Sequence, residues 1–138
     1  MDESQVFFYG LFMDPDVLRK SGADAHDPRV AKVLGKALRI GERATLVDDP
    51  QAKVHGVVMT LSERDLQALY REESVAGYRP EPVTAIYADG SVVTAMSYVL
   101  PAPDGAPTNA EYARKLRAVA AKMGLPGDYV ARIGENPA

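Results

Sequence analysis

The chain has 138 residues, enough for one domain with a hydrophobic core of its own. Hydrophobic residues make up 46% and charged residues 25%, which is the composition of an ordinary globular protein. The net charge of −3 argues against nucleic acid as the main partner, because phosphate binding needs a basic face. The absence of cysteine excludes disulfides, cysteine-ligated metals and thiol nucleophiles.

The first residues of the chain bear on the localisation of the protein. Met1 leads into acidic and polar residues, without the basic and apolar regions of a signal peptide. No apolar run approaches the length that spans a bilayer. We therefore expect a cytoplasmic protein with no membrane partner, in which residues 1–138 form a single domain, present as a monomer or a homodimer.

The first predicted element is a buried strand from Val6 that runs into Gly10. A short helix follows, with Asp14 as its cap, Pro15 at its first position and Gly22 at its end. Gly10 permits either an unusual backbone angle or the close approach of another group. Unpaired amides there, facing a helix N-terminus, would bind a carboxylate or an oxyanion. The alternative is a core strand that simply stops at a turn.

The middle of the chain reads mainly as strands. We predict a loop at 22–29, strands at 30–40 and 43–47, a break at 48–50, and a further strand at 54–61. Ser62 then caps a helix that continues to about Glu73.

The second half combines a hairpin with the longest helix. Strands at 78–87 and 92–100 are joined at Asp89-Gly90, and Pro80 and Pro82 restrict the first of them to an edge. Residues 101–107 read as a surface loop. Thr108 and Glu111 form a capping box at the start of the helix, and Gly124 with Pro126 ends it. The apolar stripe of this helix consists of Tyr112, Leu116, Val119, Ala120 and Met123. These elements predict an α+β fold, a small and mostly antiparallel β-barrel flanked by helices.

Glu73 is the strongest candidate for a catalytic residue in the sequence. In a helix that starts after Ser62, it continues the face of Leu66, Leu69 and Tyr70, which points to the core. Apolar surroundings raise the pKa of a carboxyl group toward neutrality, which suits a general acid/base. The alternative is a helix that frays before Glu73 and leaves its side chain in solvent.

Other kinds of site have little support. His26 and His55 lie far apart in the sequence and have no second metal ligand at a suitable spacing, so we expect no metal. The chain has neither a Gly-rich phosphate loop nor a Gly-x-Ser-x-Gly elbow, and we expect no cofactor. Tyr78, Tyr98 and Tyr112 are by default packing residues whose hydroxyls reach the surface.

Seven short segments together resemble the γ-glutamylcyclotransferase-like family over nearly the full length. They are 7–13 (FFYGLFM), 54–58 (VHGVV), 69–75 (LYREESV), 77–79 (GYR), 97–100 (SYVL), 111–112 (EY) and 124–126 (GLP). No single segment is specific, but their order and spacing are.

The resemblance implies a small β-barrel that holds a γ-glutamyl group and cyclises it to 5-oxoproline, with release of an amine or amino acid. It implies that Tyr9, Gly10 and Leu11 present backbone amides to the substrate, that Glu73 is the general acid/base, and that Tyr112 lines the site. Phe12 and Tyr78 complete the set of substrate-binding candidates. The substrate supplies its own α-amine as nucleophile, so the reaction requires no serine, cysteine or metal.

Two positions depart from the family pattern. Leu11 stands where a serine or threonine is usual, and Ser74 stands where a glycine is common. Both favour a second hypothesis, a non-catalytic module that binds a small carboxylate on the same scaffold. A third hypothesis is a protein-interaction domain, which a filled barrel mouth would support.

Overall fold

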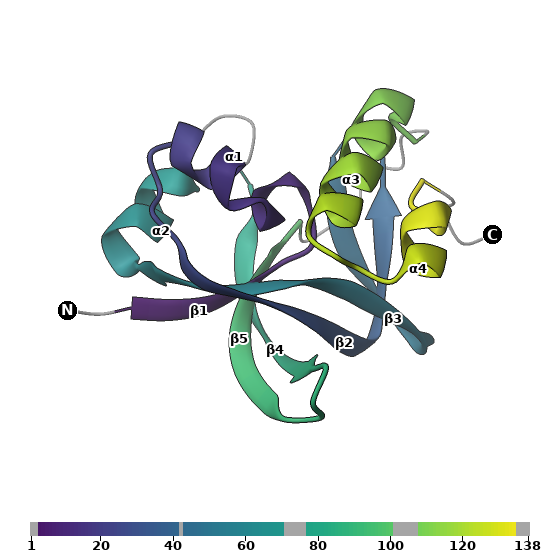
Figure 1. Ribbon diagram of the computed structural model, residues 1–138, viewed down its shortest axis with the longest axis horizontal. Coiled ribbons are helices and arrows are strands. Elements are labelled where there is room, and N and C mark those ends of the chain that lie inside the picture. Colours follow the sequence, from purple (N-terminus) through teal and green to yellow (C-terminus); the bar gives the residue numbers. More distant parts are fainter. Residues whose placement is uncertain (1–2, 42, 71–76, 101–107, 135–138) are drawn as a thin grey trace.

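The computed structural model describes residues 3–41, 43–70, 77–100 and 108–134. At its centre, five strands form a closed barrel in the order β1-β3-β2-β4-β5 (Figure 1). The strands are β1 (Glu3–Phe8), β2 (His26–Ile40), β3 (Ala44–Ser62), β4 (Arg79–Tyr87) and β5 (Val92–Val99). Neighbouring strands are antiparallel except β1 and β5, which meet in parallel with Val6 opposite Met96. The predicted fold class, a mostly antiparallel barrel flanked by helices, is confirmed.

Two groups of helices flank the barrel. In Figure 1, α1 and α2 lie on the left of the view, and α3 and α4 lie on the right. The helices are η1, a 3-10 turn (Leu11–Met13), α1 (Pro15–Lys20), α2 (Glu63–Leu69), α3 (Ala110–Lys122) and α4 (Gly127–Arg132). No helix in the described part of the chain has the length and apolarity that a bilayer crossing needs.

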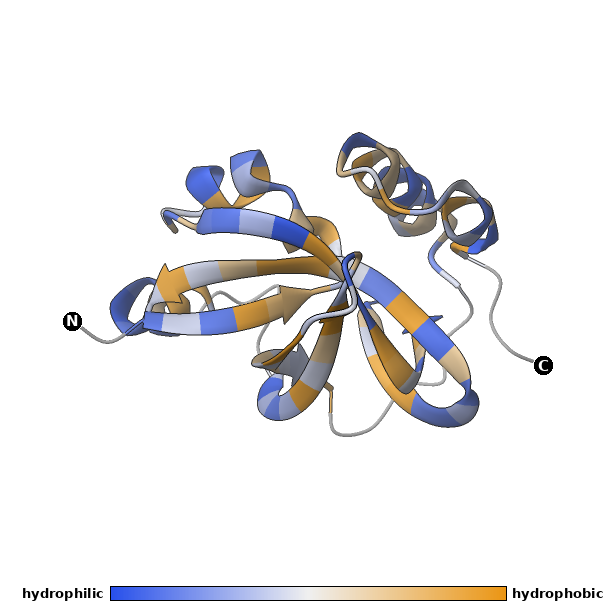
Figure 2. Cartoon of the chain, turned by 60° about the horizontal axis from the view of Figure 1, so that its bottom comes forward, coloured by the Kyte–Doolittle hydropathy of each residue, from blue (hydrophilic) through white to orange (hydrophobic). Residues whose placement is uncertain are grey.

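The core fills the barrel and the space beneath the helices. Most strands alternate apolar and polar side chains (Figure 2), and β4 buries Val83, Ala85 and Tyr87 while the residues between them are more exposed. In β1, by contrast, three successive residues are buried, Val6 to Phe8. Residues 57–59 of β3, which pair with this part of β1, are also buried in succession, so both segments are covered on their two faces.

Strand β2 begins earlier than its sequence suggests. Residues 22–29 were predicted to be a loop, but β2 starts at His26. The register with β3 shifts between His26 and Arg29, and Asp27 has a φ of 55°. Pro28, which has no amide hydrogen to donate, lies within this irregularity. The loop prediction was wrong at its end because a bulge carries these turn-forming residues within the strand.

Strand β3 is one element, and the two predicted strands at 43–47 and 54–61 are its ends. The β2–β3 register passes from Leu34 opposite Lys53 to Lys36 opposite Asp48, which leaves residues 49–52 of β3 opposite Gly35 alone in β2. The local turn is present, since the Gln51 amide donates to Asp49 Oδ1 at 3.0 Å. It forms a bulge rather than the predicted break because both sides of it still pair with β2.

The β4–β5 hairpin agrees with the sequence. The turn holds Gly90 at φ 89°, and the Gly90 amide donates to the Tyr87 carbonyl. Strand β2 pairs with β4 only at Ile86 and Tyr87. Pro80 and Pro82 therefore lie in the part of β4 that pairs with β5 but not with β2. A proline has no amide hydrogen to donate, so it fits where a strand has a paired neighbour on one side alone.

The start of α3 differs from the predicted capping box. Asn109, not Thr108, is the N-cap, and its Oδ1 accepts a hydrogen bond from the Tyr112 amide at 3.1 Å. The helix is thus shifted by one residue, and Tyr112 occupies the third helical position that Glu111 was expected to hold. The predicted apolar stripe is confirmed, with Leu116 and Ala120 buried.

Candidate active site

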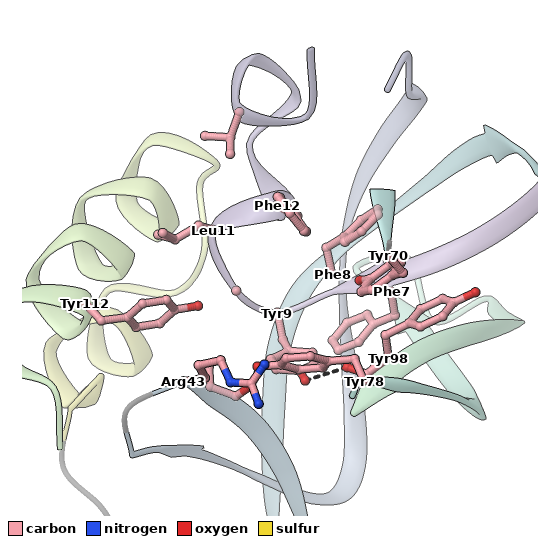
Figure 3. A pocket seen from close by; sticks show the side chains of 13 residues that line it. Phe7, Phe8, Tyr9, Leu11, Phe12, Arg43, Tyr70, Tyr78, Tyr98 and Tyr112 are labelled. Carbon is pink, nitrogen blue, oxygen red and sulfur yellow. Dashed lines mark hydrogen bonds between the residues drawn. The ribbon is translucent and has the colours of Figure 1, made fainter. Parts of the chain in front are cut away.

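A cavity of about 200 Å³ opens where β1 leaves the barrel. Residues from both ends of the chain line it (Figure 3). They are Phe7, Phe8, Tyr9, Gly10, Leu11, Phe12, Val17, Arg43, Ala44, Tyr70, Tyr78, Tyr98 and Tyr112. All six substrate-binding candidates named from the sequence, at positions 9–12, 78 and 112, lie in this one lining. The barrel mouth is therefore open, contrary to what the third hypothesis, a protein-interaction domain, would favour.

The exit of β1 turns sharply into η1 and α1. Gly10 precedes the 3-10 turn, and its carbonyl accepts a hydrogen bond from the Met13 amide at 3.0 Å. Asp14 then caps α1 by accepting from the Asp16 amide at 2.9 Å, with Pro15 at the first helical position, as predicted. The amides at the start of a 3-10 turn have no partner within the turn, and residues 10–12, which carry them, line the cavity.

Tyr112 reaches this backbone from α3. A Cβ atom built on Gly10 would stand 2.8 Å from the Tyr112 hydroxyl oxygen. Gly10 itself has an extended conformation, with φ −110°. Of the two reasons considered for this glycine, close approach is therefore the one that applies. Burial raises the pKa of Tyr112 to about 12, partly offset by a hydrogen bond from the Leu11 backbone.

A group of tyrosines forms the opposite wall. The Tyr9 hydroxyl donates to the Tyr98 carbonyl at 2.6 Å, and the rings of Tyr70 and Tyr98 stack with centroids 3.9 Å apart. The Tyr70 ring also lies 6.4 Å from that of Tyr78. Burial raises the pKa of Tyr9 and of Tyr70 well above the ordinary value. At neutral pH these hydroxyls are protonated donors and do not serve as bases.

Arg43 supplies the charge in this lining. Its guanidinium lies 5.2 Å from the centre of the Tyr78 ring, and the Tyr78 hydroxyl donates to the Ala44 carbonyl. None of the described lining residues carries a carboxylate. Sequence reasoning did not single out Arg43, and it treated Tyr70 and Tyr98 only as packing residues. The signal that could have indicated the two tyrosines is that several predicted elements begin or end near an aromatic residue.

Glu73, the predicted general acid/base, lies outside the described residues, as does Ser74. Helix α2 ends at Leu69 with Tyr70 as its C-cap, so the prediction that the helix continues to about Glu73 was wrong. The face of Leu66, Leu69 and Tyr70 does point inward, with both leucines buried. The residues between Tyr70 and Glu73, over which this face would have to continue, lie outside the described part of the chain.

Comparisons with known proteins agree on the family. Residues 6–119 match the family model described as gamma-glutamyl cyclotransferase, AIG2-like. A gamma-glutamylcyclotransferase from Bos taurus is 28% identical over 95 residues, 67% of this chain and 50% of the bovine protein. The chain thus spans about half the length of this curated relative.

Solved structures share the fold. One named gamma-glutamyl cyclotransferase has a TM-score of 0.83 at 21% identity, over 99% of this chain and 90% of its own. An uncharacterised protein from Homo sapiens has a TM-score of 0.82 at 24% identity, over 100% of this chain and 90% of its own. The match to the family model covers most of the chain and joins β1 to α3, the elements that frame the cavity. The chain therefore belongs to the AIG2-like gamma-glutamyl cyclotransferase family.

Proposed function

We propose that this protein is a cyclotransferase that converts a γ-glutamyl amine or γ-glutamyl amino compound into 5-oxoproline and a free amine. One observation supports this most: the exit of β1 and the tyrosines of four other segments enclose one small cavity. Its volume of about 200 Å³ is below the roughly 300–1,000 Å³ typical of sites for drug-sized ligands. A cavity of this size suits a single bent γ-glutamyl group.

Ring closure needs no nucleophile from the protein. The α-amine nitrogen attacks the side-chain amide carbon, a C–N bond forms, and the bond to the departing amine then breaks. The α-ammonium nitrogen loses two protons to become the lactam N–H, and the departing amide nitrogen gains two to leave as the ammonium form of the amine, so the reaction consumes no water and no cofactor. Holding the chain bent against aromatic walls favours this intramolecular attack.

Stabilisation of the oxyanion is assigned to the exit of β1. The hydroxyl of Tyr112 is protonated at neutral pH and hydrogen-bonded to the Leu11 backbone. A hydroxyl that accepts from an amide becomes a better donor, because linked hydrogen bonds polarise one another. The tetrahedral intermediate would place its oxygen beside this hydroxyl and the amides of Gly10 and Phe12.

The proton transfer is assigned to Glu73. The described lining holds protonated tyrosines and an arginine but no group that accepts a proton at neutral pH. Glu73 is three residues beyond Tyr70 and five before Tyr78 in the sequence, and both tyrosines line the cavity. The family resemblance gives the same residue this role.

The test is the release of 5-oxoproline from a panel of γ-glutamyl amines and γ-glutamyl amino acids. We expect Glu73→Gln to lower kcat by at least about 100-fold, the usual effect of removing a general acid/base. Glu111→Gln is the matched control, because the Glu111 side chain is 67% exposed and its partner is Lys115 on the helix surface. Equal turnover by the wild type and Glu73→Gln would remove Glu73 from the mechanism.

A second candidate is a non-catalytic module that binds a small carboxylate. Leu11 favours it, because an apolar side chain lines the cavity where the family usually has a hydroxyl. This function predicts that 5-oxoproline raises the melting temperature in a saturable manner. It also predicts that no γ-glutamyl compound of the panel is consumed, so any useful rate of cyclisation contradicts it.

A further inference from the structure

Arg43 is the charged residue among the described residues around the cavity. It comes just before β3, on the opposite side of the lining from η1, and is partly buried. Its guanidinium lies 5.2 Å from the centre of the Tyr78 ring, close enough for a cation–π interaction. Figure 3 shows its head beside Tyr78 and Tyr9, with the Tyr112 ring on its other side. An aromatic ring at this distance restricts where the guanidinium can lie.

A γ-glutamyl group brings a carboxylate into this aromatic cavity. Besides the α-amine that attacks and the amide that is cleaved, it carries an α-carboxylate that takes no part in bond making. Moving that charge from water to an apolar lining is costly unless an opposite charge meets it. The protein as a whole has a net charge of −3, so attraction for an anion must come from a local group.

We propose that Arg43 binds the α-carboxylate of the γ-glutamyl group and thereby restricts the substrate to compounds that carry it. The inference rests on the proposed function and names the part of the substrate that this site selects. A planar guanidinium offers two parallel N–H donors to a carboxylate, and both charge and geometry select that group. Fixing the α-carboxylate on the Arg43 side also fixes the adjacent α-amine, which must reach the amide carbon at the β1 exit.

The test compares two substrates that differ only in this carboxylate. A γ-glutamyl amine closes to 5-oxoproline, and the corresponding 4-aminobutyryl amide closes to 2-pyrrolidinone with release of the same amine. We expect kcat/KM of the wild type to be about 10- to 150-fold higher for the γ-glutamyl amine, the range for a hydrogen bond to a charged group. A wild type that handles both substrates equally overturns the proposal.

Variants of Arg43 connect this preference to the residue. Arg43→Met should lower kcat/KM for the γ-glutamyl amine by a similar factor and leave that for the 4-aminobutyryl amide nearly unchanged. Arg43→Lys should retain part of the preference, because it keeps the charge but not the paired donors. Arg29→Met is the matched control, since Arg29 lies 3.6 Å from the centre of the Tyr87 ring and lines a different cavity.

A third substrate locates the carboxylate that is bound. A γ-glutamyl amino acid carries a second carboxylate on its leaving group. If Arg43→Met affects γ-glutamyl amino acids strongly and γ-glutamyl amines hardly at all, Arg43 recognises the leaving group and the proposal fails.

Binding experiments separate this inference from the proposed function. Titration calorimetry with 5-oxoproline and 2-pyrrolidinone uses ligands that require no turnover. We expect the wild type to bind 5-oxoproline more tightly and Arg43→Met to bind both alike, even where no cyclisation is detected. That result would support Arg43 while the cyclotransferase proposal failed. A wild type with no preference for 5-oxoproline, through binding both equally or neither, would overturn the role of Arg43.

Discussion

The hydroxyl of Tyr112 lies against the backbone of Gly10, where a Cβ atom would stand only 2.8 Å from its oxygen. This contact joins α3, from the end of the chain, to the exit of β1, from its beginning. Because the Tyr112 amide is also held by the Asn109 side chain, the start of α3 is fixed beside the cavity. The position of this hydroxyl depends on the absence of a side chain at position 10.

We predict that Gly10→Ala destabilises the protein by displacing the Tyr112 side chain. Overfilling a packed site costs typically about 1–3 kcal/mol. Removal of the hydroxyl should relieve the clash, so the double variant Gly10→Ala, Tyr112→Phe should be more stable than the sum of the single effects allows. Urea unfolding of the four proteins in this cycle measures the coupling. Additive effects would show that the methyl group is accommodated elsewhere.

Gly56 in β3 has an even tighter environment. A Cβ atom there would lie 2.3 Å from the Phe8 carbonyl oxygen and 2.8 Å from the Phe7 ring. Because the nearest atom belongs to the backbone, the barrel itself would have to shift. We expect Gly56→Ala to lower the unfolding free energy by more than about 3 kcal/mol, beyond the usual range for a single substitution.

Gly127, where a Cβ atom meets nothing within 4 Å, provides the control. Gly127→Ala lies at the first position of α4 and should change the unfolding free energy by less than about 1 kcal/mol. If the two glycine variants unfold at the same urea concentration, the close packing of β1 on β3 is not what requires Gly56.

His55 makes stability depend on pH. Burial lowers its pKa, Lys53 and Lys32 lower it further, and Asp128 opposes them. The unfolded chain therefore binds a proton more readily than the folded one. The stability that comes from keeping His55 neutral in the folded state is fully present above the unfolded pKa of about 6.5. It decreases as the pH falls below that value toward the folded pKa.

The check is the urea midpoint of the wild type and of His55→Gln between pH 8 and pH 5. The variant should lose less stability on acidification than the wild type, because it has no imidazole to protonate at position 55. A wild type and variant with parallel pH profiles would show that His55 is not responsible.

The sequence predicted the barrel because its strongest signals are local. The Asp89-Gly90 turn between two strands and the capping of α1 by Asp14 depend on neighbours in the chain, and both are present. The turn at Asp49 is also real, but the same side-chain hydrogen bond serves a strand end and a bulge alike. Only the pairing of β2 with β3 on both sides of it decides between them.

Part of the candidate site was also predictable from local segments of the sequence. Tyr9, Gly10 and Tyr112 belong to segments that resemble a family, so they could be named in advance. Arg43 lies in none of these segments, and it lines the cavity only because the barrel closes. The helical periodicity behind Glu73 assumed a longer helix than α2, which ends at Leu69, so the proposed role of Glu73 rests on the family resemblance and on the lining's need for a base.

The most direct test of the central proposal is the identity of the product formed from a γ-glutamyl amine in water enriched in heavy oxygen. Cyclisation makes no bond to water, so the account predicts 5-oxoproline without the label and one equivalent of free amine. Labelled glutamate as the product would contradict it, because the substrate would then have been hydrolysed rather than closed on itself.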